Sequence, residues 1–159
     1  PARDYPTLLR TSIQHKLHIV TRQQLSSKLL GPEVRVSSDH SFEQLRDLYR
    51  AARFVVIPLQ DVDQPSGQSA ALQAMACAKA VILTRTQGLW EVEHMRHMDT
   101  CYLVEPGNVE KLREAMDYLY ANPGEAERIG LNARRLVDRR YNARILARNL
   151  QRHVLEVIA

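Results

Sequence analysis

The sequence has few cysteines and no long apolar run, and each shortage limits what the chain can be. Cys77 and Cys101 lie in apolar segments without CxxC spacing, which favours buried, reduced thiols over a disulfide and predicts a cytoplasmic location. No run approaches the ~18 apolar residues of a membrane span, and nothing resembles a signal peptide. Internal repeats and low-complexity segments are also lacking. The composition therefore favours an ordinary globular domain.

The chain also lacks an initiating methionine. It begins at Pro1, directly before the helix-like segment YPTLLRTS, so we expect it to have been cut from a longer protein with an N-terminal partner domain. Its 159 residues, of which 45% are hydrophobic, are enough for a core of ordinary size without a metal or a disulfide. We therefore predict a single domain that spans residues 1–159.

Positive charge is concentrated at the C-terminal end. Between Arg128 and Ala159 the chain has eight arginines and only two acidic residues, whereas its overall net charge is +4. This region lacks the interleaved aromatic residues and groove-reading motifs of nucleic-acid-binding proteins, so we expect no nucleic-acid partner. A solvated helix face, an acidic neighbouring domain and an anionic membrane surface all fit such a basic face. The last of these would make the protein a peripheral membrane protein.

The stretch from Phe54 to Thr84 is the clearest structural unit. It reads as a buried strand, a polar loop, an alanine-rich helix and a second buried strand. We expect further strands at residues 17–21, 34–36 and 101–104, helices at residues 5–14, 42–49 and 89–98, and three more helices after residue 108. Ser41 and Gln44 have the spacing of a capping box. The pattern predicts an α/β fold with an open parallel sheet flanked by helices and a helical C-terminal third.

The loop before the alanine-rich helix is the best candidate binding site. A helix that opens after a Ser/Gly turn presents unpaired N–H groups and the positive end of its dipole, which suits an anion and most naturally a phosphate. Ligands of parallel sheets sit beyond the carboxyl ends of the strands, which adds two residues that follow the first strand. The candidate ligands are Ser66, Gly67, Gln68, Ser69, Thr21 and Arg22.

Four segments together resemble a known family: ARFVVIPL, SGQSAALQAMACAKAVI, YLVEPGNVEKLREAMDYLYANP and IGLNARRLVDRRY. They are similar to the C-terminal, donor-binding, Rossmann-like domain of the retaining GT-B glycosyltransferases (group 1), over nearly the whole chain. The family helix usually reads Leu-Glu-Ala-Met-Ala-Cys-Gly-Lys-Pro-Val, and the matches here are Leu72, Ala74, Met75, Ala76, Cys77, Lys79 and Val81. The run RDYPTLL resembles the first helix of that domain, where a basic residue approaches the donor diphosphate. The resemblance implies this role for Arg3.

Two positions depart from the family pattern. The family usually places two glutamates, with seven residues between them, across this loop and helix; the first lies near the donor sugar and the second accepts hydrogen bonds from the ribose. The corresponding residues here are Pro65 and Gln73. The amide of Gln73 can still bond to ribose hydroxyls, without the charge of a carboxylate. Pro65 cannot replace a glutamate, so the sugar contact would pass to Gln68, Asp63 or Asp61.

The resemblance implies a glycosyltransferase that moves a sugar from a nucleoside diphosphate sugar, such as a UDP or GDP sugar, to an acceptor with retention. The implied partners are the nucleotide-sugar donor and an N-terminal acceptor-binding domain. The resemblance implies no cofactor, assigns no catalytic residue in this half, and makes this chain incomplete and inactive alone. Three alternatives stay open: a nucleotide-sugar epimerase, a sugar phosphorylase of the same fold, and a degenerate binding module without activity.

Two sets of residues resemble metal sites. The run Asp61–Asp63 has the Asp-x-Asp spacing with which the unrelated GT-A transferases hold a divalent cation. Glu91, His94 and His97 recur at helical spacing, but no fourth ligand lies near them in the sequence, and an exposed helix face explains them better. We therefore assign no metal. Trp90 fits a stacking contact with a base or sugar and a core anchor equally well.

Overall fold

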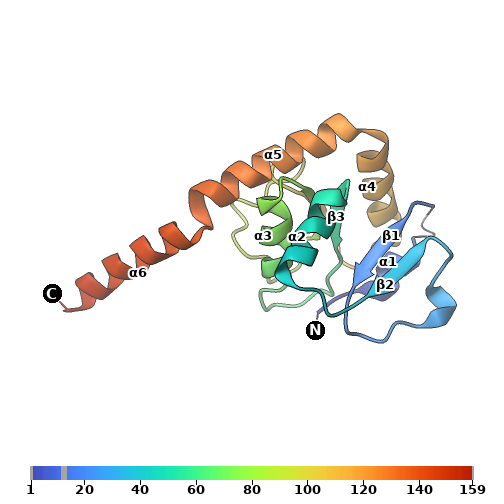
Figure 1. Ribbon diagram of the computed structural model, residues 1–159, viewed down its shortest axis with the longest axis horizontal. Coiled ribbons are helices and arrows are strands. Elements are labelled where there is room, and N and C mark those ends of the chain that lie inside the picture. The colour runs from blue at the N-terminus through green and yellow to red at the C-terminus, as the bar shows by residue number, and fades with distance from the viewer. Residues whose placement is uncertain (1, 12–13, 159) are drawn as a thin grey trace.

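The computed structural model describes residues 2–11 and 14–158, except for the side chains of residues 157 and 158. Five parallel strands lie in the first two thirds of the chain, and a helix or 3-10 turn connects each to the next except between the fourth and fifth, which turns connect; the last third is helical (Figure 1). The strands are β1 (Leu17–Val20), β2 (Val34–Ser37), β3 (Phe54–Ile57), β4 (Ala80–Thr84) and β5 (Tyr102–Val104). The helices are α1 (Tyr5–Leu9), the 3-10 turn η1 (Ser27–Leu29), α2 (Phe42–Ala51), α3 (Gln68–Ala76), α4 (Val109–Ala121), α5 (Pro123–Arg140) and α6 (Ala143–Ile158).

The strands form two parallel sheets. β1 pairs with β2, and β4 lies between β3 and β5 in a three-stranded sheet. Ile19 of β1 belongs to the same apolar cluster as Ile82 of β4, and Phe54 and Val56 of β3 pack against that cluster. The α/β prediction with parallel strands and flanking helices is therefore confirmed, although the hydrogen bonds divide the strands between two sheets.

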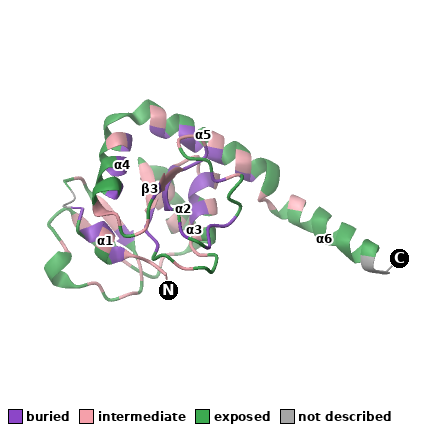
Figure 2. Cartoon of the chain, turned by 180° about the vertical axis from the view of Figure 1, so that it is seen from behind, coloured by how far each residue is buried: buried purple, intermediate pink, exposed green. Residues whose placement is uncertain are grey.

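The core lies on both faces of β4. All five residues of this strand are buried, as expected for a central parallel strand with helices on both sides. Successive strand side chains point to opposite faces, so Ala80 and Ile82 pack with residues of α1 and α4, whereas Val81 and Leu83 pack with residues of α3 and α5. Figure 2 shows the buried residues gathered on the inner faces of these elements.

Helix α5 lies directly on the turn between α3 and β4. A Cβ atom at Gly130 would lie 2.8 Å from the carbonyl carbon of Ala78 and 3.0 Å from the nitrogen of Ala80. Real Cβ atoms essentially never approach backbone atoms so closely, so only glycine permits this contact. The small residues of α3, including the buried Ala71 and Ala74, bring the helix close to the sheet in the same way.

Most of the predicted elements are present. The expected strands agree with β1 to β5 to within about a residue, which is the usual uncertainty of an element boundary. The capping box of α2 is formed, since Ser41 Oγ accepts from Gln44 N and Gln44 Oε1 accepts from Ser41 N. Both cysteines are free thiols; Cys101 is buried and Cys77 is half-buried.

Two helix predictions were wrong. The segment 89–98 is a series of turns, in which Glu91 and Met98 have positive φ values of 51° and 58°. Thr100 stabilises these turns, because its hydroxyl donates to the carbonyl of His94 and accepts from the backbone N–H of Arg96. The first helix ends at Leu9 instead of residue 14; residues 12 and 13 lie outside the described part of the chain.

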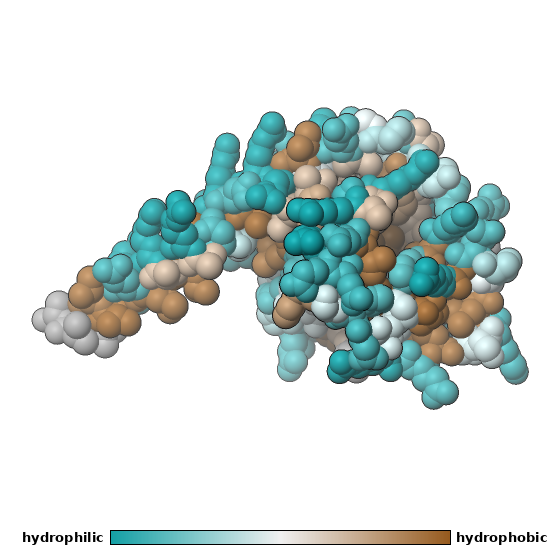
Figure 3. Space-filling view, in the orientation of Figure 1, coloured by the Kyte–Doolittle hydropathy of each residue, from teal (hydrophilic) through white to brown (hydrophobic). Residues whose placement is uncertain are grey.

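Helix α6 extends away from the rest of the domain (Figure 1). Its side chains are almost all exposed, including Leu146, Leu150 and Val154, which are 60%, 56% and 57% accessible (Figure 2). Figure 3 shows apolar side chains along one side of this helix and hydrophilic ones along the other. Among the described residues, no helix combines the length and the apolar character needed to cross a membrane.

Candidate functional site

The start of α3 is open to a ligand. Gly67 is the N-cap residue and has a φ of 76°, in the left-handed region that glycine adopts most easily. No described side chain caps this end of the helix, and Gln68 and Ser69 are exposed while Ser66 is half-buried. The N–H groups of the first helical turn and the positive end of the helix dipole therefore favour an anion here.

Arg3 lies against this helix start. The N-terminal segment runs antiparallel to the chain after β3: the backbone N–H of Asp4 donates to the carbonyl of Pro58 at 3.0 Å, and that of Gln60 donates to Ala2 at 2.9 Å. A Cβ atom at Gly67 would lie 3.0 Å from Nη1 of Arg3, which places the half-buried guanidinium beside the N-cap. A guanidinium and a helix N-terminus thus face the same space, and both favour a phosphate group.

Gln73 lies further along α3 and is exposed. Its Oε1 accepts from the hydroxyl of Tyr49, a residue of α2, at 3.5 Å. Burial raises the pKa of Tyr49, and the positive charge of Arg3 partly offsets this effect. Tyr49 and Gln73 therefore form one polar face between α2 and α3. Pro65, exposed in the preceding loop, adds no polar side-chain atom to this face.

Thr21 and Arg22 belong to a separate group of residues at the end of the β1–β2 sheet. The backbone N–H of Thr21 donates to the carbonyl of Ser37 at 2.9 Å, and its hydroxyl accepts from Gln23 N at 3.0 Å. Arg22 is 84% exposed and pairs with Asp39 at 2.8 Å. Within the described part of the chain, no hydrogen bond or ion pair joins either residue to the start of α3.

Of the two aspartates after β3, Asp61 is hydrogen-bonded within the protein and Asp63 is exposed. Both carboxylate oxygens of Asp61 accept hydrogen bonds from Gln87, from its backbone N–H at 3.0 Å and from its side-chain amide at 3.2 Å. Asp61 thereby ties the loop after β3 to the loop after β4. Asp63 is exposed. Among the described residues, no group of three or more His, Cys, Asp or Glu side chains is placed to hold a metal ion.

The histidines after β4 also have structural contacts. His97 Nδ1 accepts from the backbone N–H of Leu103 at 3.0 Å, and its ring packs edge-on against Tyr102. His94 lies 3.8 Å from the carboxylate of Glu91. Trp90 is buried and packs edge-on against Tyr141, which makes it a core residue.

Two polar features were missed in the sequence. Tyr49 matched the apolar period of α2, and only its contact with Gln73 in the folded chain makes it part of the site. His18 and His40 both bond to the hydroxyl of Ser37 at 2.7 Å, across the ends of β1 and β2. Burial lowers the pKa of His18, and the charges of Arg35 and His40 lower it further. No sequence motif marks either feature, because each joins residues from different elements.

Solved structures share this fold. Sucrose-phosphate synthase from Thermosynechococcus elongatus matches with a TM-score of 0.78 and 22% identity over 96% of this chain and 41% of its own. HepE from Anabaena, in complex with UDP-glucose, matches with a TM-score of 0.78 and 17% identity over 99% of this chain and 46% of its own. The C-terminal domain of the group 1 glycosyl transferase LpcC from Francisella tularensis matches with a TM-score of 0.60 and 26% identity over 70% of this chain and 55% of its own. The chain thus has the fold of one part of a GT-B glycosyltransferase and spans about half of these proteins or less.

The family comparison covers most of the chain. No curated protein matches it. The family model described as "Glycosyl transferases group 1" matches residues 2–122, which include all five strands and the whole loop and helix from Pro58 to Ala76. The chain therefore belongs to the group 1 glycosyl transferases.

Proposed function

We propose that the protein binds a nucleoside diphosphate sugar at the start of α3 and takes part in transfer of the sugar to an acceptor, with retention of the anomeric configuration. In this reaction the bond between the sugar C1 and the diphosphate oxygen breaks, and C1 forms a bond to an acceptor oxygen, which loses its proton. The departing diphosphate gains negative charge. In this proposal the residues of this chain stabilise that negative charge.

The observation that carries the proposal is the position of Arg3 beside Gly67. The guanidinium lies beside the N-cap residue, directly before the open N–H groups of the first turn of α3. Preorganised positive charge of this kind stabilises a leaving group because it needs no rearrangement as the charge develops. UDP-glucose bound to HepE, a protein of the same fold, supports a nucleotide sugar as the ligand class.

Gln73 is proposed to bind the ribose. It lies exposed on the same helix, and its amide offers both a donor and an acceptor to a hydroxyl. For the sugar itself we propose Gln68 and Asp63, because both are exposed near the start of α3. Asp61 is a poor choice, since both its oxygens already bind Gln87.

The acceptor is proposed to bind a second domain. The chain spans less than half of sucrose-phosphate synthase and of HepE, and the remainder of such a protein would supply the acceptor site. Helix α6 extends away from the domain with Leu146, Leu150 and Val154 exposed, and these side chains suit a contact with such a domain. Transfer activity is expected only when both parts are present.

A nucleotide titration tests the donor site. The protein is heated with UDP, GDP or ADP at about 1 mM, and a Kd of about 0.1 mM would stabilise it by about 1.4 kcal/mol, or about 3–6 °C. Arg3→Gln and Gln73→Ala should each reduce the shift. The matched controls Arg113→Gln and Gln151→Ala, at exposed positions on α4 and α6, should keep it. Absence of a shift with all three nucleotides would contradict the proposal.

The arginines of α6 are proposed to contact an anionic membrane surface. Arg144, Arg148 and Arg152 recur every four residues, so they share one side of the helix, opposite the apolar side formed by Leu146, Leu150 and Val154. Vesicles of phosphatidylcholine with and without phosphatidylserine test this by pelleting. Equal binding to both kinds of vesicle would remove the membrane proposal and leave the donor site unaffected.

A further inference from the structure

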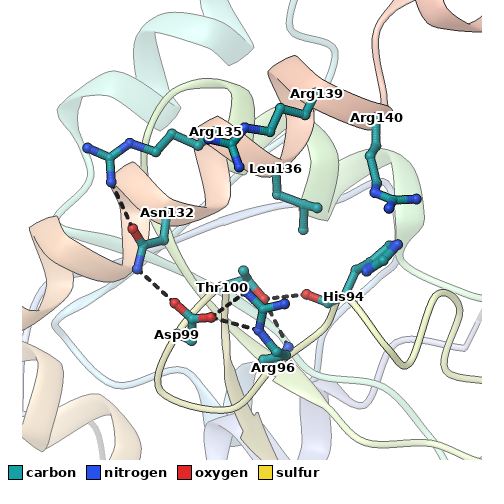
Figure 4. Close-up of a pocket in the computed structure, with 9 residues that line it drawn as sticks. All are labelled: His94, Arg96, Asp99, Thr100, Asn132, Arg135, Leu136, Arg139 and Arg140. Atoms are coloured by element: carbon teal, nitrogen blue, oxygen red, sulfur yellow. Dashed lines mark hydrogen bonds and ion pairs between the residues drawn. The ribbon is translucent and has the colours of Figure 1, made fainter.

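A second basic site lies away from the start of α3. The last three turns of α5 and the turns of residues 94–100 enclose a cleft of about 460 Å³, well within the size range of small-molecule sites (Figure 4). Residues 96–100 directly precede β5, so this side of the cleft lies at the amino ends of the strands. The donor loop follows β3 and lies at the carboxyl ends. We call the second site the arginine cleft.

The arginine cleft carries positive charge that the protein does not neutralise. Four arginines and a single acidic residue, Asp99, line it. Asp99 is already fully engaged: one carboxylate oxygen binds Arg96 at 2.6 and 2.7 Å, and the other accepts from the side-chain amide of Asn132 at 2.8 Å. The remaining three arginines all belong to α5: Arg135, Arg139 and Arg140.

Other arginines of the same helix do have acidic partners. Arg128 pairs with Glu125 and Arg134 pairs with Asp138, each at 2.8 Å. In the described part of the chain, no carboxylate pairs with Arg135, Arg139 or Arg140; Arg135 bonds only to the amide oxygen of Asn132 at 3.1 Å. The unneutralised charge is therefore confined to the side of α5 that faces the cleft.

The helix dipole explains only part of this arrangement. Arg139 and Arg140 lie in the last turn of α5, where positive charge is favourable, but Arg135 lies a turn earlier. Arg135 and Arg139 are four residues apart, so they are neighbours on the helix surface and their like charges repel. An anion between them would remove this repulsion.

We propose that the arginine cleft binds a phosphate monoester. Guanidinium groups match phosphate oxygens with paired N–H donors, and several of them around one group favour a dianion. Figure 4 shows Leu136 and Arg140 directed from α5 toward the turn that carries His94, with the cleft between them. The polar groups of Thr100 and Asn132 are already hydrogen-bonded within the protein. Recognition therefore depends on the guanidinium groups, and both a soluble phosphate monoester and a lipid headgroup with a terminal phosphate meet the requirement.

Inorganic phosphate is the probe, at constant ionic strength, with binding followed in two-dimensional ¹H–¹⁵N NMR spectra. Saturable shifts are expected at residues 94–100 and 135–141. The variant Arg135→Gln/Arg139→Gln should bind about tenfold more weakly. The matched control Arg144→Gln/Arg148→Gln removes the same charge from α6 and should bind as the unchanged protein does. Arg3→Gln should leave these shifts unchanged, which separates the arginine cleft from the donor site.

Vesicles that contain phosphatidic acid distinguish the two sources of the phosphate. Pelleting that is stronger with phosphatidic acid than with phosphatidylserine at the same mole fraction, and that the Arg135→Gln/Arg139→Gln change reduces to the level seen with phosphatidylserine, would assign the site to a lipid headgroup. Phosphate binding without such pelleting would assign it to a soluble monoester. The proposal is overturned if the unchanged protein shows no saturable phosphate-dependent shifts at residues 94–100 and 135–141. It is also overturned if the double variant of α5 and the double variant of α6 lose the same affinity for phosphate. Circular dichroism confirms that each variant is folded.

Discussion

Replacing Gly130 with alanine should destabilise the protein, although alanine is the better helix former. In the middle of an exposed helix, such a change would add about 1 kcal/mol of stability. At Gly130 the new methyl group would meet the carbonyl carbon of Ala78 at 2.8 Å and the carbonyl oxygen at a still shorter distance. These are backbone atoms of the α3–β4 turn, so α5 as a whole would have to move. Overpacking of this kind costs about 1–3 kcal/mol, and the contact with rigid backbone atoms places Gly130 at the upper end, so after the gain in helix propensity we expect a net loss of up to about 2 kcal/mol.

Gly124 is the matched control, because it lies in the same helix and nothing is within 4 Å of the position of its Cβ atom. Gly124→Ala should leave the stability unchanged or raise it by up to about 1 kcal/mol. Urea unfolding, followed by circular dichroism, gives the free energy of unfolding of each protein. If Gly130→Ala unfolds at the same urea concentration as the unchanged protein or at a higher one, the close contact of α5 with the α3–β4 turn does not limit stability.

Two further predictions concern titratable groups. Because burial lowers the pKa of His18 below its unfolded value, the unfolded state takes up a proton first, and the free energy of unfolding should fall as the pH drops from ~7.5 to ~5.5. Urea unfolding at both pH values should show a smaller fall for His18→Gln; an equal fall in both proteins contradicts the assignment. Burial raises the pKa of Cys101 to about 12, so in the folded protein Ellman's reagent should modify the half-buried Cys77 first and Cys101 only after unfolding. Equal rates for the two thiols in the folded protein would contradict the buried position of Cys101.

The elements that local sequence determines could be predicted. Each residue of β4 is apolar or small, so the sequence of this strand alone is enough to predict that it is buried. The capping box of α2 depends on Ser41 and Gln44 alone, so its spacing was sufficient. The segment 89–98 shows the limit of this approach. Its apolar residues Leu89, Trp90 and Met95 are buried by contacts with distant elements, and a side chain outside the segment, that of Thr100, replaces helical hydrogen bonds.

The residues that lie at the start of α3 could be predicted from the sequence, but the distances between the candidate residues could not. Gly67 and its flanking residues follow from the turn before a helix, and Arg3 lies beside them because the N-terminal segment pairs with the chain after β3. Thr21 and Arg22 were chosen by the same strand-end rule, yet they form their own contacts at the β1–β2 sheet. The position of a residue after a strand shows that it lies at the carboxyl edge of a sheet. It does not show how far apart two loops lie along that edge, because this distance depends on the arrangement of the β1–β2 sheet relative to the β3–β4–β5 sheet.

The replacement of a family glutamate by Gln73 has a chemical meaning in this arrangement. A glutamate at this position could only accept hydrogen bonds, and it would accept from the ribose. The Oε1 atom of Gln73 accepts from the hydroxyl of Tyr49 at 3.5 Å and keeps a second lone pair, and the amide nitrogen adds two N–H donors. Gln73 therefore offers a ribose hydroxyl both an acceptor and a donor, whereas a glutamate offers acceptors alone. Because a hydroxyl both donates and accepts, the change at Gln73 is compatible with the proposed donor binding. Under the same proposal, the change at Pro65 leaves the sugar contact to another residue.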